Sequence, residues 1–588
     1  MAAELQGWHV VAARHQETIE SKIPQAWQLS ENLLNNVAPM ALPRQSGILS
    51  DWELSITESK AVDILAELRH GRVKAVDVTR AFCKRAAIAQ QATNCVAEIL
   101  FEEALDRAAE LDKYMETHGR PKGPLHGLPI SVKEHIHMQG TKATCALMAW
   151  ADHTSSKDAL IVRVLREQGA VFHVKTTNPQ TLMAIETDSN LFGRTVNPHN
   201  PSLTCGGSSG GEGALIAMGG SVIGIGTDIG GSIRVPSAFC GIHGLKPSVA
   251  RLPHSGLSGL QDGMQNIVGA VGPMARCAED LDLFCSAALA NRPWDHEPSL
   301  IELPWKTSIE IPPRLTIGVI WNDGVVHPHP PVSRALKNTV AALRGQGHRV
   351  VDWNTDLHRQ LVDAANEAYF LDGGKEYRDI LAEGLEPPVP IIEWLLETNA
   401  GRPHTVEETW KLNAKIERLR TLYAEQWNDI KIDAIICPVS ASVASVHNES
   451  RYWGYTSIWN VLDFPAVVMP VGKVEESDTW DEFPPASLTP LTSADDSYRQ
   501  LFENRQGASR YQHAPVAIQI VGRRLQEERI LRIARSIERC ISEPCAPSGS
   551  PLEVKGANDL EPASIQFAGS PSFWNSVAEF EDSVSVAA

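Results

Sequence analysis

The sequence lacks the features that would place the protein in a membrane or in a secretory pathway. Its 588 residues contain no run of about 18 apolar residues, the length that a membrane-spanning helix requires. The N-terminus, MAAELQGWHVVAARHQETIE, has no apolar core of the kind that a secretory signal needs. We therefore expect no membrane span and a cytoplasmic location.

Motifs for metal, redox and nucleotide chemistry are missing as well. The ten cysteines are scattered without a CxxC pair, which argues against a zinc or redox motif and favours reduced thiols. Asp228 stands without a His/Asp cluster at ligand spacing, and Lys246 precedes a proline, so no P-loop is formed. We expect no metal and no cofactor.

The charge balance is acidic and contains no basic cluster. Lys and Arg number 53 and Asp and Glu 71, which gives a formal net charge of −18. Because no Lys/Arg run of the nucleic-acid type occurs, a nucleic-acid partner is not expected. The length allows more than one domain or one large α/β unit. The sequence leaves the oligomeric state open between a monomer and a homodimer.

Against these absences stands one dense concentration of glycine. Eleven of the 42 glycines fall within residues 206–231, where three Gly-Gly-Ser triplets end at Ser208, Ser221 and Ser232. Glycine permits tight turns and close backbone approach, so hydroxyls placed there suggest a nucleophile beside an oxyanion hole. Glycine-rich turns around a buried strand would explain the same composition. The pattern by itself does not choose among the serines.

The flanking sequence alternates between short apolar runs and helical periodicity, which is typical of an α/β sheet. The periodicity predicts helices over 57–71, 76–90, 101–117, 158–168, 278–291, 332–344 and 405–428. Apolar runs predict strands over 127–133, 170–175, 268–275, 315–321, 348–353, 432–437, 466–470 and 516–521. The first of these strands ends in Lys133, and apolar strands rarely end in a buried lysine unless it is paired or functional.

Four segments together are more specific than any one of them. They are Pro129–Glu134 (PISVKE), Gly206–Gly211 (GGSSGG), Gly226–Ser237 (GTDIGGSIRVPS) and Gly241–Pro247 (GIHGLKP). In this order they resemble the sequence signature of the amidase signature family. Phe192–Pro198 (FGRTVNP) and Trp459–Pro470 (WNVLDFPAVVMP) are most similar to its fungal acetamidase and fatty-acid-amide-hydrolase-like branch.

The resemblance implies an α/β fold, an α/β/α sandwich built on a large mixed β-sheet. It also implies a Ser–Ser–Lys triad, in which Ser232 is the nucleophile, Lys133 the base and Ser208 the bridge between them. Ser208 would follow a cis peptide bond after Gly207. Serine needs such a base because it is a poor nucleophile at its own pKa.

Further site residues follow from the same resemblance. The backbone N–H groups of Ile229, Gly230, Gly231 and Ser232 would form the oxyanion hole. Asp228 and Arg234 would shape the site, or act as structural anchors. Leu182 and Met183 would line an acyl pocket, and a plain core role explains them equally well.

The resemblance divides the chain into an N-terminal helical segment, 1–56, and one domain over 57–545, with its signature core at about 125–250. Composition predicts an irregular insertion over 474–508, which is acidic and rich in Pro and Ser. It also predicts a disordered tail over 546–588.

The implied function is hydrolysis of a carboxylic amide to an acid and an amine or ammonia through an acyl-enzyme. An esterase or aryl-acylamidase of secondary metabolism is compatible with the same site. A glutaminase subunit of an amidotransferase and a non-catalytic homologue are further alternatives. The resemblance leads us to expect a smaller residue at His137, so His135 and His137 either narrow the pocket or simply pack. The acyl and amine groups of the substrate stay open.

Overall fold

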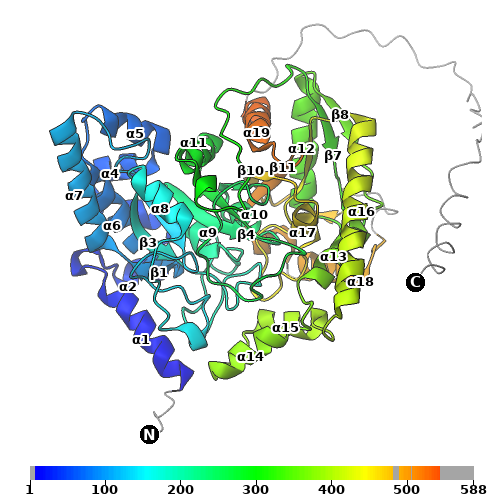
Figure 1. The fold of residues 1–588 in the computed structure, drawn as a ribbon, viewed down its shortest axis with the longest axis horizontal. Helices are drawn as coiled ribbons and strands as arrows, with labels where there is room; N and C mark the ends of the chain where they lie inside the picture. Colours follow the sequence, from blue (N-terminus) through cyan, green and yellow to red (C-terminus); the bar gives the residue numbers. More distant parts are fainter. Residues whose placement is uncertain (1–6, 481–488, 505, 543–588) are drawn as a thin grey trace, which may run out of the picture. The chain divides into compact units, whose positions relative to one another are not determined.

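A single mixed sheet of eleven strands carries the fold in this computed structural model, which describes residues 7–480, 489–504 and 506–542 (Figure 1). The strand order is β1-β3-β2-β4-β6-β5-β10-β11-β9-β7-β8. The strands are β1 (Val96–Ile99), β2 (Pro129–Lys133), β3 (Val171–Thr176), β4 (Ile223–Asp228), β5 (His243–Lys246), β6 (Ala270–Ala275), β7 (Thr316–Val319), β8 (Arg349–Asp352), β9 (Ala434–Pro438), β10 (Ala466–Lys473) and β11 (Pro515–Val521).

The sheet contains two parallel groups of three strands with antiparallel pairs between them, and the edge strand β1 pairs with β3 in antiparallel fashion. Strand β2 pairs in parallel with β3 and β4, and β7 pairs in parallel with β8 and β9. Between these groups, β4, β6, β5, β10, β11 and β9 pair in antiparallel fashion. The eight strands predicted from apolar runs are all present in this sheet.

Helices cover both faces of the sheet. They are α1 (Trp8–Ser21), α2 (Glu31–Asn36), α3 (Leu42–Gln45), α4 (Asp51–Glu58), α5 (Ala61–Arg69), α6 (Ala75–Thr93), α7 (Phe101–His118), α8 (Leu160–Glu167), α9 (Gly210–Ala217), α10 (Arg234–Cys240), α11 (Ala278–Leu289), α12 (Pro330–Gly345), α13 (His358–Ala368), α14 (Lys375–Glu383), α15 (Pro390–Asn399), α16 (Val406–Ile430), α17 (Gly454–Val461), α18 (Ser493–Glu503) and α19 (Glu527–Ser542). In Figure 1, α4 to α7 gather beyond β1 and β3, and α12 and α16 lie near β7 and β8.

The two faces can be read from β4, because neighbouring strand residues point to opposite sides of a sheet. Ile223 and Ile225 belong to the apolar cluster that includes Leu281 of α11. Gly224 faces the other way, and a Cβ there would collide with the Glu212 carboxylate of α9. Helices α9 and α11 therefore pack on opposite faces, which confirms the α/β/α sandwich.

Several elements had no clear sequence signal. Strand β1 and helix α19 lie outside the predicted ranges. Within the segment 474–508, expected to be irregular, Ser493–Glu503 form α18, whose Tyr498 and Phe502 are buried. The high polar content of this helix belongs to its solvent face. Residues 481–488 and 505 of that segment, and the tail 546–588, lie outside the described residues.

The N-terminal helices α1 to α4 pack against the sheet domain. Ile19 of α1, Leu42 of α3 and Leu54 of α4 share an apolar cluster with Cys83 of α6. No helix among the described residues combines the length and the apolar character needed to cross a bilayer.

We predict that Gly211→Ala, in the first turn of α9, destabilises the protein. A Cβ at Gly211 would collide with the backbone nitrogen of Thr177 and the carbonyl oxygen of Cys95. Overpacking of this kind costs about 1–3 kcal/mol, so the denaturant midpoint of unfolding should fall. Gly401→Ala is the matched control, because Gly401 is exposed and its Cβ would have open space. Equal midpoints for the two variants would contradict the prediction.

Candidate active site

Lys133 ends β2 with its side chain fully buried. Its amine is hydrogen-bonded to Ser208 Oγ at 2.6 Å and donates to Thr227 Oγ1 at 2.9 Å. Burial lowers the pKa of Lys133 to about 7, against the opposing influence of Asp228 and other nearby acids. Desolvation disfavours the charged form of an amine, so a large fraction of Lys133 is neutral at pH 7. A neutral amine can accept a proton.

Ser208 lies at the turn that leads into α9, directly after a cis peptide bond with Gly207, as the resemblance implied. The adjacent Ser209 is turned toward β4, where its hydroxyl contacts the backbone N–H and carbonyl of Thr227 at 3.3 Å. Ser221 donates to the carbonyl of Ile223 at 2.8 Å and accepts the N–H of Ser131 at 3.1 Å, so it has a structural role.

Asp228 and Arg234 form a fully buried ion pair at 2.8 Å that organises the turn carrying Ser232. The Asp228 carboxylate also accepts the backbone N–H groups of Gly231 at 2.9 Å and Ile233 at 3.1 Å. Burial alone would raise the pKa of Asp228, but the Arg234 guanidinium holds it well below the usual range. The carboxylate therefore stays charged and fixes the turn.

This arrangement occupies one of the four backbone N–H groups that the resemblance assigned to the oxyanion hole. The N–H of Gly231 points to the Asp228 carboxylate and is already hydrogen-bonded there. The two residues before Gly231 accept hydrogen bonds, through their carbonyl oxygens, from side chains outside this turn. The carbonyl of Ile229 accepts the Tyr369 hydroxyl at 2.8 Å, and that of Gly230 accepts the Thr456 hydroxyl at 2.6 Å.

The two supporting hydroxyls come from distant parts of the chain. Tyr369 directly follows α13, and Thr456 lies on α17. A Cβ at Gly230 would lie 2.8 Å from the Tyr369 hydroxyl, so only glycine fits at this position without a shift. Sequence reasoning missed Tyr369 and Thr456 because neither lies in a recognisable motif.

Ser208 and Ser232 line the same cavity, which has a volume of about 490 Å³. Leu182 and Met183 line it too, so the structure brings together the residues expected at the acyl pocket and the two serines. Much of the remaining wall is a loop over residues 254–269, between β5 and β6. This loop carries apolar side chains but no motif, and sequence analysis did not identify it.

His135 and His137 hold this loop in place. His135 Nδ1 lies 2.7 Å from the carbonyl of Ser258, and His137 Nε2 lies 2.9 Å from the Ser258 hydroxyl. His135 lines the cavity, whereas His137 is not among the described lining residues.

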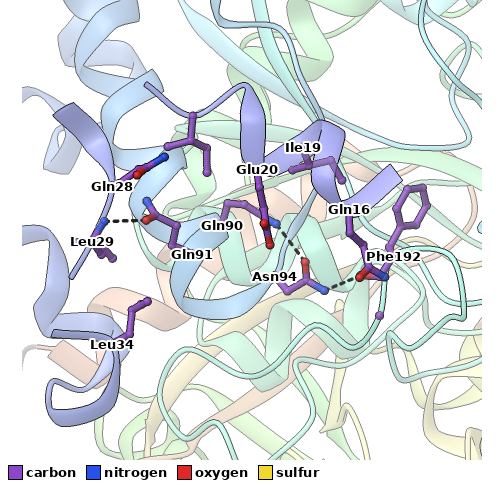
Figure 2. Close-up of a pocket in the computed structure, with 12 residues that line it drawn as sticks. Gln16, Ile19, Glu20, Gln28, Leu29, Leu34, Gln90, Gln91, Asn94 and Phe192 are labelled. Atoms are coloured by element: carbon purple, nitrogen blue, oxygen red, sulfur yellow. Dashed lines mark hydrogen bonds between the residues drawn. The ribbon is translucent and has the colours of Figure 1, made fainter. Parts of the chain in front are cut away.

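A second cavity, of about 560 Å³, lies between α1 and α6 (Figure 2). The amide side chains that line this cavity form hydrogen bonds with one another and with nearby backbone groups. Gln90 donates to Asn94 at 3.0 Å, and Asn94 donates to the carbonyl of Phe192 at 2.7 Å. None of the described residues that line this cavity is a serine, cysteine, lysine or histidine. The chemistry-bearing groups lie instead around Ser232.

Comparisons with known proteins identify the family to which the chain belongs. The chain matches the family model described as Amidase over residues 77–531. It is 41% identical over 548 residues to a protein of Aspergillus oryzae named acetamidase, covering 91% of this chain and 99% of the relative. An acetamidase of Emericella nidulans is 40% identical over 557 residues, covering 92% of this chain and all of the relative. A solved fatty acid amide hydrolase has a TM-score of 0.86 at 30% identity, covering 92% of this chain and 98% of that one.

The chain therefore belongs to the amidase signature family. Within it, the chain falls in the branch of the fungal acetamidases and the fatty acid amide hydrolase. It is a hydrolase of carbon–nitrogen bonds other than peptide bonds.

We predict that Asp228→Asn strongly destabilises the protein, because it leaves the Arg234 guanidinium buried without its counter-charge. Breaking a buried ion pair typically costs about 3–5 kcal/mol, which a shift in the denaturant midpoint would report. Asp295→Asn is the control, since Asp295 pairs with Arg292 on the surface, with side chains 53% and 57% exposed. The midpoint of this control should stay at the wild-type value. A similar stability of both variants would show that the buried pair does not hold the turn.

Proposed function

We propose that this enzyme hydrolyses carboxylic amides to an acid and an amine through a Ser232–Ser208–Lys133 triad. The observation that carries the proposal is the 2.6 Å contact between Lys133 Nζ and Ser208 Oγ, beside a cavity that Ser232 also lines. A lysine kept partly neutral by burial can act as the ultimate base for a serine nucleophile.

In the first step, Ser232 Oγ attacks the amide carbonyl carbon. Its proton passes to Ser208 Oγ, while the proton of Ser208 passes to Lys133 Nζ, so the relay ends with a lysine ammonium. The tetrahedral intermediate carries its negative charge on the former carbonyl oxygen. The backbone N–H groups of Ile229, Gly230 and Ser232 are the proposed donors to it, because Gly231 is bonded to Asp228.

Collapse of the intermediate breaks the carbon–nitrogen bond. The leaving nitrogen takes the proton back along the same path, and an acyl ester on Ser232 remains. A water molecule then attacks the ester, with the triad again accepting a proton and returning it to Ser232. The acid is released and the enzyme is restored without a cofactor.

The cavity favours a neutral amide larger than acetamide. Its volume of about 490 Å³ lies within the range of roughly 300–1,000 Å³ that sites for drug-sized ligands occupy. Its described wall includes Asp228, Asp262 and Glu297 but no arginine or lysine. The carboxylate of a glutamine substrate would therefore find no cationic partner in this wall, which argues against the glutaminase alternative. Esters of similar shape would meet the same nucleophile.

We predict that Ser232→Ala abolishes both amide turnover and covalent labelling by a fluorophosphonate probe, which reacts with activated serine hydroxyls. Ser221→Ala, taken from another Gly-Gly-Ser triplet, is the matched control and should keep its labelling because its hydroxyl only bonds backbone. Gel fluorescence and mass spectrometry of the labelled peptide would measure both. Full labelling of folded Ser232→Ala would remove Ser232 from its proposed role.

We also predict the pH dependence of that labelling. Lys133 has a lowered pKa of about 7, so it loses its proton, and becomes a base, as the pH rises through 7. The second-order rate of labelling should rise about tenfold per unit below pH 7 and level off above it. A rate that keeps rising toward pH 10, near the ordinary lysine pKa of about 10.4, would show that Lys133 is not perturbed as the structure indicates.

A further inference from the structure

His135 joins the base of the proposed triad to the loop that covers the cavity. The ring is buried and contacts two groups, one on each side. Its Nδ1 lies 2.7 Å from the carbonyl oxygen of Ser258, and its Nε2 lies 3.0 Å from Thr227 Oγ1. Thr227 Oγ1 in turn lies 2.9 Å from Lys133 Nζ. The four groups form one continuous chain of hydrogen bonds.

The donor and the acceptor of each hydrogen bond in this chain follow from the carbonyl of Ser258, where the chain begins. The Ser258 carbonyl can only accept, so His135 Nδ1 must carry a hydrogen and donate it. Burial, with Lys133 close by, lowers the pKa of His135 well below its ordinary value, so the ring is neutral. A neutral ring with a hydrogen on Nδ1 has a bare Nε2, which must accept the Thr227 hydroxyl hydrogen.

With its hydrogen turned to His135, Thr227 offers only lone pairs to Lys133. A neutral amine has two N–H groups and one lone pair. One N–H donates to Thr227 Oγ1 at 2.9 Å, and this bond sets the rotation of the amine about its carbon–nitrogen bond. The lone pair can then face Ser208 Oγ, 2.6 Å away, which is the direction from which a proton must arrive.

We propose that His135 is a positioning residue that acts through Thr227 to aim the lone pair of Lys133 at Ser208. The inference rests on the proposed function, in which Lys133 is the base. Without His135 the Thr227 hydroxyl is free to turn its hydrogen to the amine lone pair. It then competes with Ser208 for the same electrons and weakens the base.

Several titratable groups surround this chain of hydrogen bonds. Asp228, Cys145, Glu212 and Glu134 act on Lys133. Burial raises the pKa of Glu212 to about 8 and that of Cys145 well above its ordinary value. None of the four is altered by the substitutions at His135 and Thr227, so they are common to every protein compared. His254 and Lys175 act on His135 itself. The part of the change in Lys133 that disappears when Thr227 is also replaced is therefore attributable to the hydrogen-bond chain.

A double-mutant cycle on the rate of fluorophosphonate labelling tests the inference. His135→Phe keeps a buried aromatic ring but removes both nitrogens. It should slow labelling by roughly 3- to 100-fold, which corresponds to the interaction energies measured between residues of one hydrogen-bond network. The rising part of the pH–rate profile of labelling, here called the acid limb, reports the pKa of Lys133. In His135→Phe the acid limb should move to lower pH, because the Thr227 hydrogen now stabilises the neutral amine. In His135→Phe/Thr227→Val the competing hydroxyl is gone, so the rate should match Thr227→Val alone.

Two amide variants keep the test decisive where His135→Phe does not fold. Gln places its amide oxygen near the position of His Nε2 and can accept from Thr227, whereas Asn reaches only the position of Nδ1. His135→Gln should therefore retain the wild-type acid limb, and His135→Asn should show the shift seen with Phe. Additive losses in the cycle, or an acid limb that stays in place in both Phe and Asn variants, would overturn the inference. Wild-type protein that is not labelled on Ser232 would instead overturn the proposed function.

Discussion

The burial of one amine is the constraint on which the site depends. Lys133 sits at the end of an interior strand with no exposed surface, and desolvation there makes its deprotonated form accessible near neutral pH. Its two hydroxyl partners replace the water that it has lost. The sandwich of helices on both faces of the sheet creates this dry position, so the same packing that stabilises the fold also lowers the pKa of the proposed base.

The second fixed point is the Asp228–Arg234 pair, which joins the signature core to the rest of the chain. Arg234 also donates to Asn460 at 2.6 Å and to the carbonyl of Thr456 at 2.9 Å, both on α17. Tyr369 reaches the same turn from the end of α13. A short glycine-rich segment could not hold its shape unaided, and these contacts from 140 to 226 residues away in sequence supply the support that the glycines lack.

Much of the fold was predictable because local rules agree with the tertiary structure. Short apolar runs bounded by turns became strands, and long periodic segments such as α16 became helices. The apolar run of strand β1 is interrupted by Glu98, and the strand is ordered by pairing with β3. Helix α18 was missed because its segment is polar and rich in proline and serine, although Tyr498 and Phe502 bury one face.

The sequence by itself determined the family, and through that resemblance it supplied the proposed triad, since Lys133, Ser208 and Ser232 lie in motifs whose residue types and order are visible without coordinates. It also placed Leu182 and Met183 where the cavity has its wall. Only the tertiary structure decided that the N–H of Gly231 is not free for the proposed oxyanion hole, because it is hydrogen-bonded to the Asp228 carboxylate. The role of His135 was equally hidden, since it depends on a carbonyl 123 residues away. Hydrogen-bond direction is a property of neighbours in space, and sequence order does not record it.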